Sequence, residues 1–128
     1  MKINMTTSEV VDLFKNITDF LKKDMTLSRQ FVWDLEDNYE IMKKIVDRFE
    51  KHRDELFSPL SEKNAFEVIE DGKVRVKNEY RDEFIKANNE AEEYLNTVND
   101  IEIKTVDKNS VPDNLSVNDW RAIKFMCV

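Results

Sequence analysis

Apolar residues recur every three or four positions along the first half of the chain, which predicts two helices. The first helix begins after Thr6, because Thr6 and Glu9 have the spacing of a capping box, in which each side chain accepts a hydrogen bond from the other residue's backbone amide. This helix fades around Lys22. The second helix runs from about residue 27 to residue 57, and Pro59 is predicted to end it.

The second helix carries an apolar seam whose members step alternately by four and three residues, as in a coiled coil. The seam consists of Leu35, Tyr39, Met42, Val46, Phe49, Arg53 and Leu56. Phe31 and Ile45 lie beside it and widen the apolar arc. Since that arc is wider than a two-stranded coiled coil needs, we expect more than one element to pack on this helix.

Apolar and polar side chains alternate over residues 65–77, which predicts a β-hairpin. A two-residue turn would place Val68 opposite a charged residue, whereas a three-residue loop over 70–72 pairs Val68 with Val74. A one-residue slip moves every side chain to the other face of the sheet. We therefore predict the three-residue loop, with Gly72 in the left-handed conformation.

A third helix is predicted over residues 79–98, with Asn78 as its N-cap. Its apolar stripe again steps by four and three and consists of Tyr80, Phe84, Ala87, Ala91, Tyr94 and Val98. The second and third helices have matching stripes and are joined by a tight hairpin, so they should fold back antiparallel. The two alanines would let them approach closely opposite Met42 or Val46.

The last part of the chain predicts one strand and one helix. Period-two alternation over residues 101–106 indicates a strand, and the start of the chain is a candidate to pair with it. The final helix should begin at Ser116 and run to the C-terminus, with Val117, Trp120 and Ile123 on its buried face.

The predicted fold is a single α+β domain over residues 1–128, predominantly helical. It combines a long antiparallel helical hairpin, a short β-hairpin at its tip, flanking N- and C-terminal helices and a small terminal β-pairing. One glycine and two prolines in 128 residues agree with long uninterrupted helices. No apolar run reaches the length of about 20 residues that spans a membrane, and no signal-peptide pattern precedes the first helix.

Charge and cysteine content narrow the environment and the partners. The net charge of −7 disfavours direct nucleic-acid binding, which depends on cationic side chains at phosphates. An acidic body can instead attract a basic surface of another protein. Cys127 is the only cysteine and cannot form an internal disulfide. We therefore expect a cytoplasmic protein that binds neither membrane nor nucleic acid.

The residue pattern contains no converging set of catalytic, cofactor-binding or metal-binding residues. His52 is the only histidine and should lie half-exposed at the edge of the seam, with Glu55 within reach but no predictable nucleophile nearby. A di-iron site would need Glu-x-x-His pairs, which are missing, and one glycine cannot build a phosphate-binding loop. Cys127 is interpreted as a small apolar residue. We expect no enzymatic activity and no cofactor.

Apolar residues outside the predicted core give the candidate interface. Trp33 falls opposite the seam of the second helix, among the charged residues Asp37, Glu40 and Lys44. Burial under the first or last helix is the simpler interpretation, and an anchor for a protein partner is the alternative. Trp120, Phe125 and Met126 make the last helix apolar on two sides, so it is either enclosed in the core or open to a partner.

The order of elements supports a resemblance to a group of viral proteins. A long helix is followed by the hairpin sequence Ile69-Glu70-Asp71-Gly72-Lys73-Val74, a charged helix, the strand Ile101-Glu102-Ile103-Lys104 and the closing segment Leu115-Ser116-Val117-Asn118-Asp119-Trp120. This arrangement resembles small uncharacterised accessory proteins encoded by bacteriophages of low-GC hosts. The resemblance implies inhibition or redirection of a host protein, or assistance in particle assembly.

Three functional hypotheses result. The leading one is a small acidic protein-interaction module that binds and modulates a host protein, a defence system being one form, and acts in the host cytoplasm if it is phage-encoded. The alternative is a structural component that self-associates through its helices, as a homodimer or a larger assembly. The third hypothesis, an enzyme, is the least favoured of the three, because candidate acids, bases and nucleophiles do not converge in the sequence.

Overall fold

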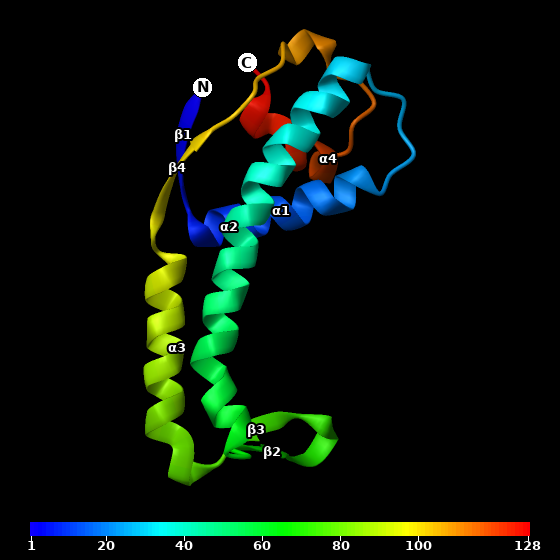
Figure 1. Ribbon diagram of the computed structural model, residues 1–128. Coiled ribbons are helices and arrows are strands. Elements are labelled where there is room, and N and C mark those ends of the chain that lie inside the picture. The colour runs from blue at the N-terminus through cyan, green and yellow to red at the C-terminus, as the bar shows by residue number, and fades with distance from the viewer. The chain divides into compact units, whose positions relative to one another are not determined.

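A computed structural model describes residues 1–128 and divides them into two compact units. The first unit comprises residues 1–47 and 98–128, and the second comprises residues 48–97. The helices and strands are β1 (Lys2–Thr6), α1 (Thr7–Leu21), α2 (Arg29–Glu62), β2 (Phe66–Val68), β3 (Val74–Val76), α3 (Arg81–Leu95), β4 (Val98–Glu102) and α4 (Val117–Ile123) (Figure 1). The predominantly helical α+β class is confirmed.

The two ends of the first unit's sequence pair as predicted. Strands β1 and β4 are antiparallel, with Ile3 opposite Ile101 and Lys2 opposite Glu102. The predicted start of the strand is wrong by three residues, because β4 begins at Val98, where we expected the third helix still to continue. Val98 pairs with Thr6, so it is the long-range pairing with β1 that ends the helical stretch early.

The capping box of α1 is confirmed. The Glu9 amide donates to Thr6 Oγ1 at 3.1 Å, and the Thr6 amide donates to Glu9 Oε1 at 3.0 Å. Phe14 of α1 stacks on Tyr39 of α2, with ring centroids 4.7 Å apart. The buried core of this unit draws on every long element in it and consists of Val10, Leu13, Ile17, Phe20, Phe31, Leu35, Met42, Val46, Ile101, Ile103, Val106, Ala122, Ile123 and Met126.

Of the three residues expected on the buried face of the last helix, only Ile123 is buried. The buried positions of this segment are Asp119, Ala122, Ile123 and Met126, and Val117 and Trp120 are exposed. The predicted start at Ser116 is confirmed, since its hydroxyl caps the helix, but α4 ends at Ile123 and a 3-10 turn follows. Val106 then forms a parallel bridge with Cys127, which draws the C-terminus away from a helical path.

Asp119 lies at the N-terminal end of α4 and is buried there. Its carboxylate accepts hydrogen bonds from Lys23 Nζ and, at 3.2 Å, from the Ser116 amide. The hydrogen bond from Lys23 is the largest of the causes that hold the pKa of Asp119 below its ordinary value. A carboxyl whose pKa is lowered on folding stabilises the fold fully at pH values above its unfolded-state pKa of about 4. This stabilisation is lost as the pH falls from there through the lower folded-state pKa.

We therefore expect Asp119→Asn to flatten the pH dependence of stability. Between about pH 6 and pH 3 the wild-type thermal midpoint should fall more steeply than that of the variant, because only the wild type must protonate this carboxylate. Thermal unfolding followed by circular dichroism at several pH values measures the difference. Asp113→Asn, at an exposed loop position, is the control and should leave the wild-type slope unchanged.

The second unit contains the C-terminal half of α2, the β-hairpin and α3, with the two helices antiparallel and the hairpin at the end of the pair (Figure 1). The three-residue hairpin loop is confirmed, because Val68 pairs with Val74 and Phe66 with Val76. Gly72 is left-handed, with φ of 71°, as predicted. Asp71 adopts the left-handed conformation as well, which the sequence pattern did not indicate.

The expected neighbours of Ala87 are wrong. Ala87 packs in a small buried cluster with Leu60 and Ala65, whereas Met42 and Val46 belong to the core of the first unit. Leu56, Phe57, Phe66, Tyr80 and Phe84 pack around that cluster. Ala87 therefore makes room for leucine side chains from the last turns of α2.

Pro59 lies inside α2 and does not end it, which corrects the predicted boundary. The helix continues to Glu62 because its real stop signal comes later. Asn64 is left-handed, with φ of 58°, and its amide donates to the Ser61 carbonyl at 3.1 Å. The Ala65 amide donates to the Leu60 carbonyl at 3.0 Å. These two bonds form a Schellman motif, closed by apolar contact between Ala65 and Leu60.

The start of the third helix also differs from the prediction. Asn78 does not cap it, because residues 78–80 form a 3-10 turn and α3 begins at Arg81, with no side chain bonded to its first amides. The Tyr80 amide instead donates to the Lys77 carbonyl at 3.0 Å. This tight turn brings the chain from the hairpin into the helix.

Candidate interaction surfaces

Trp33 is exposed on α2, with 55% of its surface accessible. The expectation that the first or last helix covers it is wrong, because those helices pack on the opposite side of α2, around Phe31 and Leu35. The Arg29 guanidinium lies 5.8 Å from the centroid of the indole ring, within cation–π distance. We define Arg29, Trp33, Asp37 and Glu40, which share this exposed side of the helix, as the Trp33 surface.

The carboxylates of the Trp33 surface are not equally free. Asp37 accepts a hydrogen bond and forms an ion pair with Lys104 Nζ, and this bond is the largest cause that raises the pKa of the lysine ammonium. Glu40 is exposed and forms no ion pair within the chain. A partner that approaches Trp33 therefore meets one available carboxylate, one neutralised carboxylate and the Arg29 guanidinium.

The three C-terminal candidates have different environments. Trp120 is 41% exposed on α4, and Phe125 is half-buried in the following turn. Met126 is fully buried, and its sulfur lies 3.7 Å from Asn38 Nδ2. Met126 is therefore a core residue and not part of an interface.

Phe125 belongs to a groove between α1 and α4, which we name the α1–α4 groove. Its apolar lining comes from Met5, Leu13 and Phe125. The remaining lining residues carry mixed charge or are polar: Glu9, Asp12, Asn16, Arg121 and Lys124. Because positive and negative side chains both line it, this groove gives no preference for the charge of a ligand.

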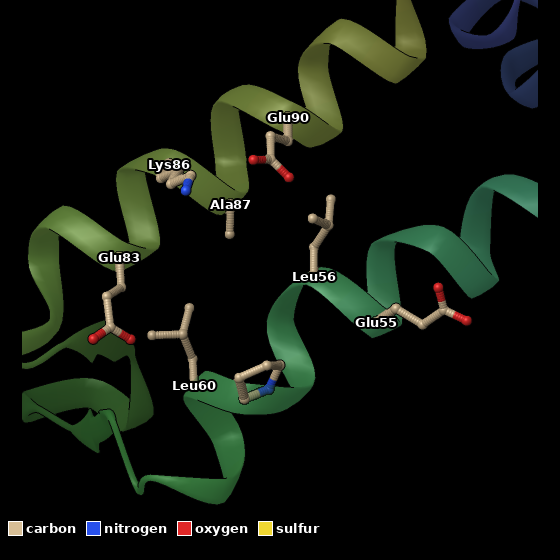
Figure 2. Close-up of a pocket in the computed structure, with 8 residues that line it drawn as sticks. Glu55, Leu56, Leu60, Glu83, Lys86, Ala87 and Glu90 are labelled. Atoms are coloured by element: carbon tan, nitrogen blue, oxygen red, sulfur yellow. The ribbon is translucent and has the colours of Figure 1, made fainter.

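A second groove lies between α2 and α3 within the second unit and is shown in Figure 2. Its volume is about 300 Å³. The apolar lining, Leu56, Pro59, Leu60 and Ala87, is bordered by Glu55, Glu83, Lys86 and Glu90. We name it the α2–α3 groove. No sequence pattern predicts this groove, because it depends on the register of α2 against α3.

His52 lies close to this groove in sequence, and its position agrees with the predicted half-exposed site. Its ring stacks on Tyr94 with centroids 4.8 Å apart. A shallow hollow beside it is also lined by Glu90, Glu93 and Thr97. No carboxylate hydrogen-bonds the imidazole, and Thr97 Oγ1 donates to the Glu93 carbonyl at 3.5 Å. The imidazole is therefore neither oriented by a carboxylate nor hydrogen-bonded to a nucleophile, as the base of an acyl-transfer site would be.

Cys127 is free and partly buried. The Cys127 thiol donates to the Ile123 carbonyl at 3.3 Å, and burial raises its pKa, so the thiolate form that reacts as a nucleophile is disfavoured. No group of three or more His, Cys, Asp or Glu side chains is placed to hold a metal ion. None of the helices combines the length and the apolar character needed to cross a membrane.

Comparison with known proteins adds no relative from which a role can be transferred. No protein-family model matches the chain, and no curated protein or solved structure matches it. The exposed residues and the grooves of the two units are therefore the features that can indicate a function.

Proposed function

We propose that this chain is a small acidic protein-interaction module that binds a protein partner through the Trp33 surface. The exposure of Trp33 supports this most directly, because indole rings are enriched among residues that dominate binding energy. A tryptophan on the core side of α2 would need no partner. On the opposite side it leaves a large apolar ring in water beside charged groups that can form a polar rim.

The resemblance to phage accessory proteins suggests a narrower form of the proposal. In that form the partner is a host protein whose activity the chain modulates, and a defence system is one such host target. The acidic balance of the chain, at −7, favours a partner with a basic surface.

Self-association through the helices remains the alternative function, and the fold offers it little surface. The seam residues Leu35, Met42, Val46 and Phe49 are buried within the chain, so they are not free to pair with a second copy. An assembly would have to use other apolar positions, such as Trp120 or the exposed Val68 and Val74 of the hairpin.

The proposal predicts that Trp33→Ala abolishes partner capture without unfolding the chain. The protein is used as bait in host-type cell lysate, and the retained partner, identified by mass spectrometry, is then purified and titrated against both forms. Loss of a central tryptophan should weaken binding by about thirtyfold or more. Circular dichroism should be unchanged, because the side chain is more than half exposed.

Ile85→Ala is the matched control, since Ile85 is also an exposed apolar residue on a helix but lies in the other unit. It should retain the affinity of the wild type. Equal affinity for Trp33→Ala and the wild type would refute the Trp33 surface as the binding site. Recovery of the bait alone, in a defined oligomer by light scattering, would favour the self-association alternative.

A further inference from the structure

The α2–α3 groove joins an apolar floor to an unequal distribution of charge. Ala87 is a short side chain between Leu56 and Leu60, so the wall formed by α3 recedes there and leaves the hollow that Figure 2 shows. A volume of about 300 Å³ is at the lower end of the range for ligand sites and suits a few inserted side chains rather than a large cofactor.

The two ends of the groove differ in electrostatic character. At the end nearer the β-hairpin, Glu83 is neutralised by Lys63, whose Nζ lies 3.0 Å from its carboxylate. At the other end, Glu55 and Glu90 form no ion pair within the chain. Figure 2 shows the Glu90 side chain on the side that faces α2, and the Glu55 side chain at the outer edge of the groove, pointing away from α3. Glu90 also borders the hollow beside His52, where Glu93 adds a further carboxylate. Lys86 borders the groove as well and forms no ion pair, so it offsets one of these charges. With Glu83 paired to Lys63, the groove keeps a small net negative charge, at the end where Glu55 and Glu90 lie.

We propose that the α2–α3 groove binds a basic amphipathic helix of a partner protein, which rests on the proposed role as a protein-interaction module but concerns a second surface. Apolar side chains of that helix fill the space between Leu56, Leu60 and Ala87. Separate lysine or arginine side chains on its two flanks pair with Glu90 and, at the outer edge of the groove, with Glu55. The bound helix lies along the two antiparallel helices as the third member of a bundle.

The physical chemistry of the groove favours this occupant. An amphipathic helix laid into an apolar groove buries its apolar face and leaves its polar face in water. The spacing of its apolar residues matches a floor built from two helices, because both repeat every three to four residues. Carboxylates at the rim attract cations and repel phosphates. Binding of nucleic acids and acidic peptides at this groove is therefore disfavoured.

A designed peptide tests the inference on the full chain. The probe is a fluorescein-labelled helix of about four turns, with leucines along one face and lysines on both sides of them. One comparison peptide has glutamate in place of lysine, and another keeps the lysines but scatters the leucines. Only the first should bind, by fluorescence anisotropy, and amide shifts in NMR should cluster at residues 55–60 and 83–90.

The double variant Glu55→Gln with Glu90→Gln should bind this peptide about tenfold more weakly, because two ion pairs to the lysines are lost. The matched control is Glu50→Gln with Glu92→Gln, which removes the same charge from the outer sides of the same two helices. The control should bind the peptide within about twofold of the wild type. Its two lost carboxylates do not line the groove, so it loses only part of the screened long-range attraction between the acidic chain and the lysines. Circular dichroism should show all variants folded.

Three outcomes would overturn the inference. They are absence of binding by the wild type, equal weakening in the double variant and its matched control, and binding that depends on lysine but not on the leucine face. Trp33→Ala separates this inference from the proposed function, because it should leave peptide affinity unchanged. Loss of peptide binding in that variant would place the peptide on the Trp33 surface and refute the groove.

Discussion

Replacing Asn38 with alanine is expected to lower the free energy of unfolding by about 3 kcal/mol. The corresponding fall in the thermal midpoint is about 10 °C for a chain of this size. Few single substitutions outside the apolar core should cost as much, because Asn38 is a fully buried polar residue in the first unit. Its amide joins helix α2 to the segment that follows β4.

The size of the effect follows from two hydrogen bonds to a single residue. Asn38 Nδ2 donates to the Lys104 carbonyl at 2.9 Å, and the Lys104 amide donates to Asn38 Oδ1 at 2.8 Å. The side chain thus pairs with the Lys104 backbone much as a neighbouring strand would. Alanine removes both partners, leaves a donor and an acceptor unpaired, and opens a cavity beside Met126.

Urea unfolding followed by far-ultraviolet circular dichroism measures this loss. Asn16→Ala is the matched control, because Asn16 is an exposed asparagine on a helix of the same unit, and its stability should stay within about 0.5 kcal/mol of the wild type. Equal stability of Asn38→Ala and the wild type would show that water or a neighbouring group satisfies Lys104 and that the pairing contributes nothing.

Asn38 also illustrates which parts of this fold the sequence can predict. Periodicity predicts the helices, and the hairpin register follows because only one loop length pairs valine with valine. The burial of Asn38, in contrast, cannot be predicted from the hydrophobic periodicity. An asparagine in a helix predicts solvent exposure, and its partner Lys104 lies 66 residues away in sequence. Whether such a residue is buried is decided by its tertiary partner and not by the periodicity of the helix.

The errors at helix ends have the same physical origin. Pro59 is a strong local stop signal, but α2 continues past it because Leu60 gains burial in the cluster with Ala65 and Ala87. The effective signal, Asn64 in the left-handed conformation, is a common residue at that position after glycine. For α3, pairing of Val98 with β1 outweighs its helical spacing.

The candidate surfaces were only partly predictable. The position of Trp33 opposite the seam follows from the helical repeat alone, but its exposure depends on where α1 and α4 pack. The α2–α3 groove requires the register of two helices and the proximity of Ala87 to Leu60, which no local pattern gives. At the C-terminus, the sequence could not separate Phe125 from Met126, because both lie in the 3-10 turn that follows α4, where the helical repeat no longer applies.

Phe125 and Met126 give the sharpest contrast between a surface and a core residue. Met126→Asp should destabilise the first unit by about 4 kcal/mol or more, because a carboxylate would replace a fully buried thioether among apolar side chains. Phe125→Asp should cost about 1 kcal/mol, since Phe125 is half-buried and its α1–α4 groove contains Arg121 and Lys124. The same substitution at neighbouring positions thus separates the two roles.

Tryptophan fluorescence and circular dichroism in urea measure both losses, and the pH dependence supplies the check. Burial raises the pKa of a carboxyl, so the folded Met126→Asp variant should take up a proton that its unfolded chain releases. Its stability deficit should therefore be smallest below about pH 4 and grow as the pH rises. Asp at position 125, near water and two cations, should show no such growth. A stable Met126→Asp protein that only loses self-association would instead identify Met126 as an interface residue.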